Sequence, residues 1–543
     1  MSVLSYPEFF NDVFGPVMQP GSSSHTAAPC RLGYLARCLL GEPPAEIRVL
    51  LDEHGSFAGT FGLMHEDQGM LAGALGWLPD DPRIFDAAAT ARAAGIAFSF
   101  DFGVMQESPH INAMKFVLTG QSGKAATLVG DSTGGGMIRT RLVNGYPLSL
   151  TGDCFATLWY DPHDTLAAAD VGAAAGRLAG YLDTETCPAP GAGRMYCVRT
   201  AEAPDAGLVR SWFPGYRVDL LRPVLPVLAW RDRRPQLFRT MTEWRQLAQE
   251  RAMPLWEVAV QYEMDVSGWT RQRVIEYMLM IAGKMHRQTS AAYEMGQVVP
   301  ESPFKPDLAA LWQRRCADPG RLTDDLTANV VRLALGAGAG IPGVESVPGP
   351  MGSGGGYIYA ALSAVKDAHR FGDDALLRGL FIAAGIGAIA YTRTEPTGEI
   401  IGCSGECGIC GAMAAAAVAE MAGGTPAQVE NAASLSLQAA MGWPCDPIPG
   451  GQSQPCRSRV LSATCMAPIF ADLALAGRDA ILPLHEVIDA VDAIGRRLPP
   501  ELLCTSRGGC STTPTALRQG AAYREWFRQA RAQNLPPPPG NLI

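Results

Sequence analysis

The chain has 543 residues, of which 47% are apolar and 18% charged, so it can bury several cores and is not intrinsically disordered. Its 44 Lys and Arg against 53 Asp and Glu give a net charge of −9, which argues against a nucleic-acid partner, since such a partner requires a basic face. The 14 cysteines are too few for a disulfide scaffold and indicate free thiols in a reducing cytoplasm.

The sequence carries no signal for export or for a membrane. Its first residues lack a basic segment followed by an apolar stretch, as a secretory signal would have. The most apolar window, residues 379–391, is well short of the roughly 20 residues that cross a bilayer. We therefore expect a cytoplasmic protein with a small soluble substrate, without a membrane partner.

Residues 1–140 mix short β-branched or aromatic runs with Ala-rich helical runs. This mixture is typical of α/β or α+β folds, and we expect an α+β multidomain protein with an N-terminal α/β substrate-binding domain. Its last strand runs into the Gly-rich turn 132–136.

A smaller unit is predicted over residues 141–228. The patterns favour a helix over 165–182, a surface loop over 186–193, and strands at 147–152, 155–161, 194–200 and 216–221. The helix falls between the second and third strands. This ββαβ order with a further strand predicts a small regulatory unit of the ACT type.

Residues 229–530 are predicted to be mostly helical, and residues 531–543 to form a flexible Pro-rich tail. Thr425, Pro426 and Gln428 form the pattern of a helix N-cap with a capping box. The run 411–423 before them is almost entirely small or apolar, so we expect a helix buried on every side.

The cysteines after residue 400 allow two metal triplets. Cys403, Cys407 and Cys410 have the C-x3-C-x2-C spacing of a radical-SAM cluster, although they lead into a helical region rather than follow a barrel strand. Cys403, Cys445 and Cys456 instead lie near Pro and Gly turns, where thiolates and amide N–H groups can point at an anionic cluster. From spacing alone, these thiols could equally be small buried core residues.

Several motifs in order resemble the iron–sulfur L-serine dehydratases. The pieces that resemble the α portion are residues 402–408, 423–430, 445–451, 455–456 and 505–509. Those that resemble the β portion are residues 21–26 (GSSSHT), 110–114 and 132–136. Residues 139–225 resemble the ACT module of two-chain members, and the α portion begins near residue 237. The resemblance implies a fused β–ACT–α chain.

The resemblance also implies roles for individual residues. It makes Cys403, Cys445 and Cys456 the ligands of a [4Fe–4S] cluster whose fourth iron has an open coordination position. His25 is the candidate base or substrate anchor. Other candidate substrate-binding residues are Ser22, Ser23, Ser24, Thr26, His65, His110, Asn112 and Ser353. Cys407, Cys410 and Cys465 are expected to be core residues, and Cys510 or Cys504 is a candidate to approach the open iron.

Two departures from the family pattern affect the expected pocket. The Gly-rich loop 347–356 replaces a PTAG-type turn, and Ser404 stands where Gln is usual. The substrate is therefore expected to be L-serine or a close analogue such as threonine, cysteine or a substituted serine.

The resemblance implies that the chain is a lyase and acts as a homodimer. It would eliminate water from a β-hydroxy amino acid and give pyruvate and ammonia through an enamine. One alternative is a cysteine desulfidase-like or specialised-pathway β-elimination on a serine analogue. A second is a non-catalytic amino-acid sensor.

Overall fold

The structure is a computed structural model that describes residues 6–62, 64–189, 193–295, 308–449 and 454–532. The chain forms two compact units: Ser24–Arg233, here the sheet unit, and Met1–Ser23 with Arg234–Ile543, here the helical unit. Residues up to 23 therefore fold with the helices that follow residue 233. The assignment of domains to 1–140, 141–228 and 229–530 stays a prediction, and the predicted tail lies outside the described residues from 533 onward.

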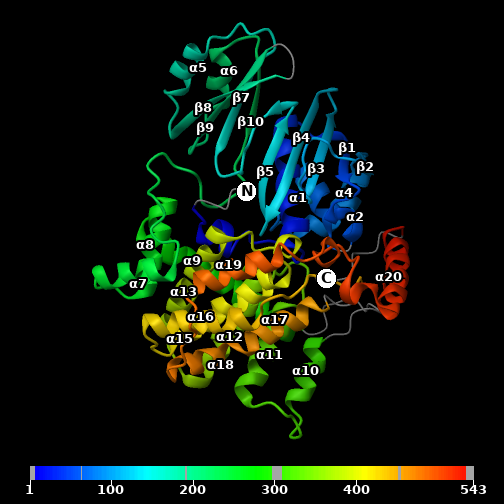
Figure 1. The fold of residues 1–543 in the computed structure, drawn as a ribbon. Helices are drawn as coiled ribbons and strands as arrows, with labels where there is room; N and C mark the ends of the chain where they lie inside the picture. The colour runs from blue at the N-terminus through cyan, green and yellow to red at the C-terminus, as the bar shows by residue number, and fades with distance from the viewer. Residues whose placement is uncertain (1–5, 63, 190–192, 296–307, 450–453, 533–543) are drawn as a thin grey trace. The chain divides into compact units, whose positions relative to one another are not determined.

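The sheet unit begins with a six-stranded sheet in the order β2-β1-β3-β4-β5-β6 (Figure 1). Its strands are β1 Pro44–Asp52, β2 Ala97–Gly103, β3 Ala113–Gly120, β4 Ala125–Gly134, β5 Met137–Val143 and β6 Tyr146–Pro147. The helices around them are η2 Ser23–Ala27, α1 Ala28–Leu40, α2 Ser56–Thr60, α3 Glu66–Leu75, η3 Pro82–Asp86 and α4 Ala87–Ala93.

This sheet is mainly antiparallel, which corrects the expected α/β class of the first domain. Only the pair β1–β2 is parallel, and helices α2 to α4 make its crossover. The pairs from β1–β3 onward are antiparallel, and short turns join β3 to β4 and β4 to β5. The fold class is therefore α+β.

Helices α1 and α3 pack closely because glycines lie at their crossing. A Cβ on Gly73 would lie 1.9 Å from the carbonyl oxygen of Cys30, and one on Gly33 would lie 2.8 Å from that of Met70. Leu32 of α1 extends to Gly130 of β4 and fixes the helix on the sheet. The glycines thus place residues 24–27, which precede α1, against the start of α3.

The second sheet has the order β10-β7-β9-β8. Its elements are β7 Phe155–Asp161, α5 Ala168–Ala175, β8 Tyr181–Pro188, β9 Arg194–Thr200, α6 Ala206–Trp212 and β10 Arg217–Leu221. The predicted ββαβ order is wrong, because the chain runs β-α-β-β-α-β, the ferredoxin-like arrangement. The predicted helix 165–182 and loop 186–193 concealed β8, whose side chains alternate poorly and are mostly exposed, and residues 148–152 form no strand.

The helical unit confirms the prediction of a mostly helical region after residue 229. Its first helices are η1 Phe9–Val13, α7 Met241–Glu250, α8 Leu255–Ser267, α9 Arg271–Glu294, α10 Leu308–Cys316, α11 Asp325–Ala337, α12 Gly354–His369 and α13 Asp373–Arg393. The rest are α14 Gly398–Ile401, η4 Ser404–Gly408, α15 Ile409–Met421, α16 Pro426–Ala439, α17 Cys456–Cys465, α18 Ala467–Leu475, α19 Leu484–Gly495, η5 Pro500–Leu502, η6 Gly509–Thr512 and α20 Pro514–Ala532.

Helix α15 lies at the centre of this unit, among α12, α13, α16 and α18 (Figure 1). All of its residues except Glu420 are buried, as the run of small side chains predicts. The next helix begins at the predicted capping box, in which Thr425 and Gln428 bond each other's backbone N–H groups. Local sequence patterns therefore predict helix α15, which follows Cys403 and Cys407 in the chain.

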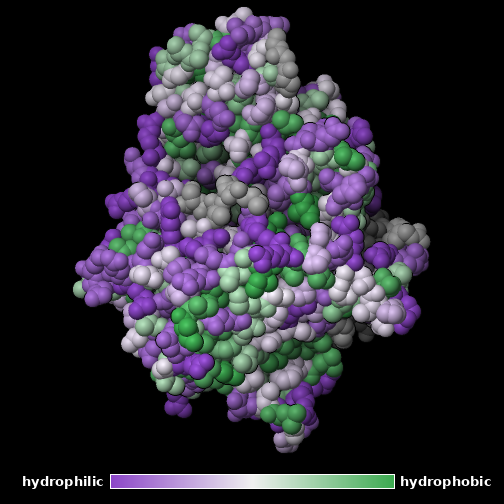
Figure 2. Space-filling model, in the orientation of Figure 1, coloured by the Kyte–Doolittle hydropathy of each residue, from purple (hydrophilic) through white to green (hydrophobic). Residues whose placement is uncertain are grey.

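Two helical stretches of the helical unit are long and apolar enough to meet the composition of a membrane span, namely Asp373–Arg393 and Cys456–Leu475. In the first, 83% of the apolar window is buried inside the unit, as in the core helix of a globular protein, and in the second 33% is buried. Figure 2 shows apolar patches interspersed with polar residues on the visible face of this unit. Length and composition alone are weak evidence for a membrane span.

Candidate metal centre and substrate site

Cys403, Cys445 and Cys456 come together in the helical unit. Their Sγ atoms all lie within 4.8 Å of one another, and all three residues are buried. The Sγ atoms of Cys403 and Cys456 are 3.5 Å apart. Among the described residues, this is the group of three potential ligand side chains that could hold a metal ion.

A different feature of the backbone positions each cysteine. Cys403 follows Gly402, whose positive φ of 71° and contact with the Trp443 carbonyl exclude a larger residue. Cys445 pairs with the chain near Leu503 through an isolated bridge, in which its N–H donates to the Leu502 carbonyl at 2.8 Å. Cys456 is the first residue of α17. Three separate segments thus converge on one buried point.

A positively charged side chain lies beside the thiols. Arg459, one helical turn after Cys456, lies 3.7 Å from the Cys403 sulfur and bonds the Pro444 carbonyl at 2.6 Å and Asp446 at 2.8 Å. Hydrogen bonds from Cys407, Cys445 and Cys456, together with the charge of Arg459, hold the pKa of Cys403 well below its ordinary value. The arrangement therefore favours a thiolate at Cys403.

The radical-SAM triplet is not assembled. Cys410 donates its thiol to the Gly354 carbonyl at 3.5 Å, and burial raises its pKa. Cys407 lies beside Cys403 and contacts the Cys456 carbonyl at 3.7 Å, but it does not belong to the three-sulfur group. Cys465 ends α17, where burial raises its pKa to about 11.

The two other cysteines near the C-terminus differ in position. Cys504 is buried, and its N–H donates to the Cys445 carbonyl at 2.8 Å. Cys510 is exposed, and its N–H donates to Asp446 at 2.8 Å. Cys504 is therefore the one that adjoins the three-sulfur group.

Ser22 and Ser23 lie against the Gly-rich loop in the helical unit. A Cβ on Gly352 would lie 3.1 Å from the Ser23 backbone nitrogen and 3.6 Å from the Ser22 Cα. The neighbouring Met351 contacts the Cys407 thiol at 4.0 Å. A short path of contacts thus joins the serines to the cysteines.

Hydrogen bonds of the Gln288 side chain fix the Gly-rich loop 347–356. Gln288 donates to the Ser346 hydroxyl at 3.1 Å and to the Ser353 carbonyl at 3.4 Å, and accepts from the Val347 N–H at 3.1 Å. Ser353 is buried at the N-cap of α12 and makes no side-chain cap hydrogen bond. The loop is therefore a fixed turn rather than a linker.

Ser24 and His25 belong to a buried hydrogen-bonded group in the sheet unit. The Ser24 hydroxyl lies 2.9 Å from His25 Nδ1, and the Ser56 hydroxyl lies 3.1 Å from His25 Nε2. Ser56 also donates to the side-chain carbonyl of Asn112, whose amide lies 3.4 Å from the Ser132 carbonyl. The structure thus brings His25 and Asn112 together through Ser56.

Three further predicted residues lie in the sheet unit. Thr26 donates to the Met64 carbonyl, and His110 accepts the Asn112 N–H at 3.1 Å through Nδ1. His65 is buried edge-on to Phe85, with ring centroids 5.0 Å apart. The role of His65 in the pocket stays a prediction.

Sequence reasoning missed four groups that complete these clusters. Burial raises the pKa of Glu66, and the charge of nearby His25 opposes that shift. Burial also raises the pKa of Glu406, which lies three residues after Cys403. The turn-by-turn spacing of Cys456 and Arg459 was the available signal for Arg459, whereas nothing local pointed to Ser56.

Ser404 has a structural role. Its hydroxyl donates to the Ala440 carbonyl at 2.7 Å and accepts from the Trp443 N–H at 2.9 Å. The residue that departs from the family pattern thus holds the segment that leads to Cys445.

Comparison with known proteins identifies the family. A family model described as "Serine dehydratase alpha chain" matches residues 250–511. The probable L-serine dehydratase alpha chain of Bacillus subtilis is 29% identical over 280 residues, which are 51% of this chain and 93% of that protein. The probable alpha chain of Latilactobacillus sakei is 35% identical over 168 residues, 31% of this chain and 80% of that protein.

A beta chain is also similar to part of this chain. The probable L-serine dehydratase beta chain of Bacillus subtilis is 38% identical over 143 residues, 26% of this chain and 63% of that protein. Serine dehydratases are lyases, and the motifs that resemble both portions occur here in a single sequence. The chain therefore belongs to the iron–sulfur L-serine dehydratase family.

Proposed function

We propose that this chain is a [4Fe–4S]-dependent lyase that eliminates water from L-serine or a close β-hydroxy amino acid. The observation that carries the proposal is the convergence of Cys403, Cys445 and Cys456 within 4.8 Å. Thiolates are the ligands that iron–sulfur clusters use, and Arg459 adds a positive charge beside the anionic sulfurs. The donor set therefore fits a cluster, and Cys403, Cys445 and Cys456 would hold it.

Held by these three thiolates, such a cluster would supply Lewis-acid chemistry for a departing hydroxide. The side chains supply the rest. The hydroxyl groups of the SSSHT segment are suited to hold the substrate carboxylate, and His25 is the candidate to remove the α-proton. Ser24 and Ser56 contact the two nitrogens of its ring, so they orient it.

Loss of the α-proton and of hydroxide converts serine into an enamine and one water. The enamine takes up a proton at the β-carbon to become an imine, and water hydrolyses the imine to pyruvate and ammonia. These last steps need no further group from the protein.

The wider arrangement is part of the same proposal. Relatives named alpha chain and beta chain both match this chain, which supports a β–ACT–α fusion. The β-α-β-β-α-β order of residues 155–221 supports an ACT-like unit. A cytoplasmic homodimer acting on a small amino acid, without nucleic acid or membrane partner, remains the expectation from the sequence.

Anaerobically purified protein should release ammonia and pyruvate from L-serine, and the same assay on L-threonine and L-cysteine defines the substrate. Sulfide release from cysteine without serine turnover would instead support the cysteine desulfidase-like alternative. Absence of turnover on all three, in protein that contains no iron, would support the amino-acid sensor.

A further inference from the structure

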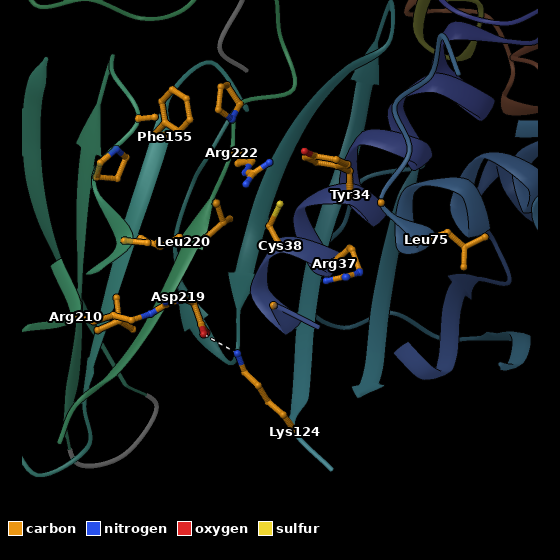
Figure 3. Close-up of a pocket in the computed structure, with 18 residues that line it drawn as sticks. Tyr34, Arg37, Cys38, Leu75, Lys124, Phe155, Arg210, Asp219, Leu220 and Arg222 are labelled. Carbon is orange, nitrogen blue, oxygen red and sulfur yellow. Dashed lines mark hydrogen bonds and ion pairs between the residues drawn. The ribbon is translucent and has the colours of Figure 1, made fainter. Parts of the chain in front are cut away.

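A cavity of about 920 Å³ opens within the sheet unit, and none of the predicted site residues lines it (Figure 3). One wall is formed by α1 and the end of α3. The other is formed by β10, the start of β7 and the segment that leads into α6. A cavity of this size can take a small-molecule ligand.

The charged side chains of this cavity are mostly cationic. They are Arg37, Lys124, Arg210, Arg222 and Asp219. Asp219 is already neutralised, because it accepts from Lys124 at 2.9 Å and from Arg217 at 2.7 Å. Within the part of the chain that the structure describes, no ion pair joins Arg37, Arg210 or Arg222 to a carboxylate.

Arg37 and Arg222 come from opposite walls. Figure 3 shows Arg222 on the strand side and Arg37 with Tyr34 on the helix side. Burial raises the pKa of Tyr34, and the charge of nearby Arg222 opposes that shift. Burial lowers the pKa of Arg37, although Cys38 and Glu42 oppose this shift. The Arg37 guanidinium is thus partly buried without a carboxylate in an ion pair. Burial of this charge costs free energy unless an anion pairs with it.

The cavity also has an apolar part, formed by Tyr34, Leu75, Phe155 and Leu220. An inorganic ion would leave this surface without a partner. A ligand with a short carbon skeleton between its charged groups would cover it.

We propose that this cavity binds a small organic anion that carries at least two negative charges. Guanidinium groups form paired hydrogen bonds with carboxylate and phosphate oxygens, so both kinds of anion fit the chemistry. A zwitterionic amino acid fits less well, because its ammonium group has only the paired Asp219 to meet. One wall consists of helices that pack with the first sheet, and the other belongs to the second sheet. A bound ligand would therefore contact both parts of the sheet unit.

Isothermal titration calorimetry on the full-length protein tests this, at constant ionic strength. The probes are O-phospho-L-serine for a phosphate ester, malonate for a dicarboxylate, and L-alanine for a neutral zwitterion. We expect one of the first two to bind and L-alanine not to bind, and the stronger of the two identifies the source of the charge.

Variants R37Q and R222Q should each weaken binding of that probe by about tenfold or more, since a charge-assisted hydrogen bond is lost. The matched control is R48Q, an exposed arginine on β1 that does not line the cavity. The heat signal does not depend on iron, so it is independent of the proposed lyase activity. The proposal is overturned if neither anion binds, if L-alanine binds as well, or if R37Q and R222Q bind like R48Q.

Discussion

The Sγ atoms of Cys403 and Cys456 lie 3.5 Å apart, although 53 positions separate them in the chain. Cys456 begins α17, and the same helix carries Arg459, whose guanidinium lies 3.7 Å from the Cys403 sulfur. Helix α17 thus supplies both a thiol and a positive charge that offsets the negative charge of the thiolates. This pairing determines how firmly an anionic cluster would be held.

We expect R459Q to bind iron but to lose it to a chelator several-fold faster, because the thiolates lose a neighbouring positive charge. The rate at which visible absorption decays in a fixed concentration of chelator measures this. R459K keeps the charge and should be intermediate, while R271Q removes an exposed pairing with Glu257 and should behave as the wild type. Equal decay of R459Q and wild type would exclude this role for Arg459.

Replacement of His25 should separate catalysis from cluster binding. We expect H25A to keep its iron and to lose turnover by about 100-fold or more, the contribution of a positioned general base. S56A should lose less, because Ser56 only orients the ring. H54A is the matched control, since the His54 side chain is 76% exposed. Full turnover of H25A would remove His25 from the mechanism.

Two glycine-to-alanine variants test the close packing of α1 and α3. A Cβ on Gly73 would lie 1.9 Å from the Cys30 carbonyl, so G73A should lower the melting temperature by about 5 °C or more. Gly172, on α5, has nothing within 4 Å of its added Cβ. G172A should raise the melting temperature by about 2 °C, because the unfolded chain loses freedom. Scanning calorimetry of both proteins decides, and tolerance of G73A would contradict the observed crossing.

The cap of α11 gives a pH-dependent prediction. Asp324 accepts the Thr327 N–H at 2.6 Å, and this bond and the Thr327 hydroxyl lower the pKa of Asp324 below its ordinary 3.8. A lowered pKa means that the stabilisation is present above the unfolded pKa and is lost as the pH falls through the folded pKa.

D324A should therefore lower the free energy of unfolding by about 1 kcal/mol at pH 7, and the difference should shrink below about pH 4. D324N, which caps without titrating, should keep most of the stability at both pH values. Urea unfolding at pH 7 and pH 3 measures both effects. A difference between wild type and D324A that is unchanged at pH 3 would show that the carboxylate charge is not the cause.

Local patterns in the sequence predicted those parts of the fold that depend on local chemistry. The capping box at Thr425 and the buried helix α15 follow from residue types a few positions apart. Strand β8 was missed because the helix predicted from the Ala-rich run of α5 was continued through Gly176 and Gly180 to residue 182. The antiparallel order of the first sheet depends on long-range pairing, which periodicity does not reveal.

The candidate site divides in the same way. Motif order singled out Cys403, Cys445 and Cys456 before any distance was known, whereas spacing alone also allowed Cys407 and Cys410. Arg459 and Ser56 gain their significance only from tertiary contacts with Cys403 and His25. The one-turn spacing of Cys456 and Arg459 is a local signal for Arg459, whereas no local pattern distinguishes Ser56 from other serines.

Cys403, Cys445 and Cys456 are proposed to hold an iron–sulfur cluster. A single tetrahedral zinc ion is the alternative occupant, because bonds of about 2.3 Å would place its ligand sulfurs about 3.8 Å apart. Zinc is therefore measured together with iron and sulfide. The decisive measurement is the iron, zinc and acid-labile sulfide content of anaerobically purified wild type, C445S and C410S. We predict about four iron and four sulfide per chain in wild type and C410S, and their loss in C445S. Zinc in place of iron, or a cluster kept by C445S and lost by C410S, would contradict the account.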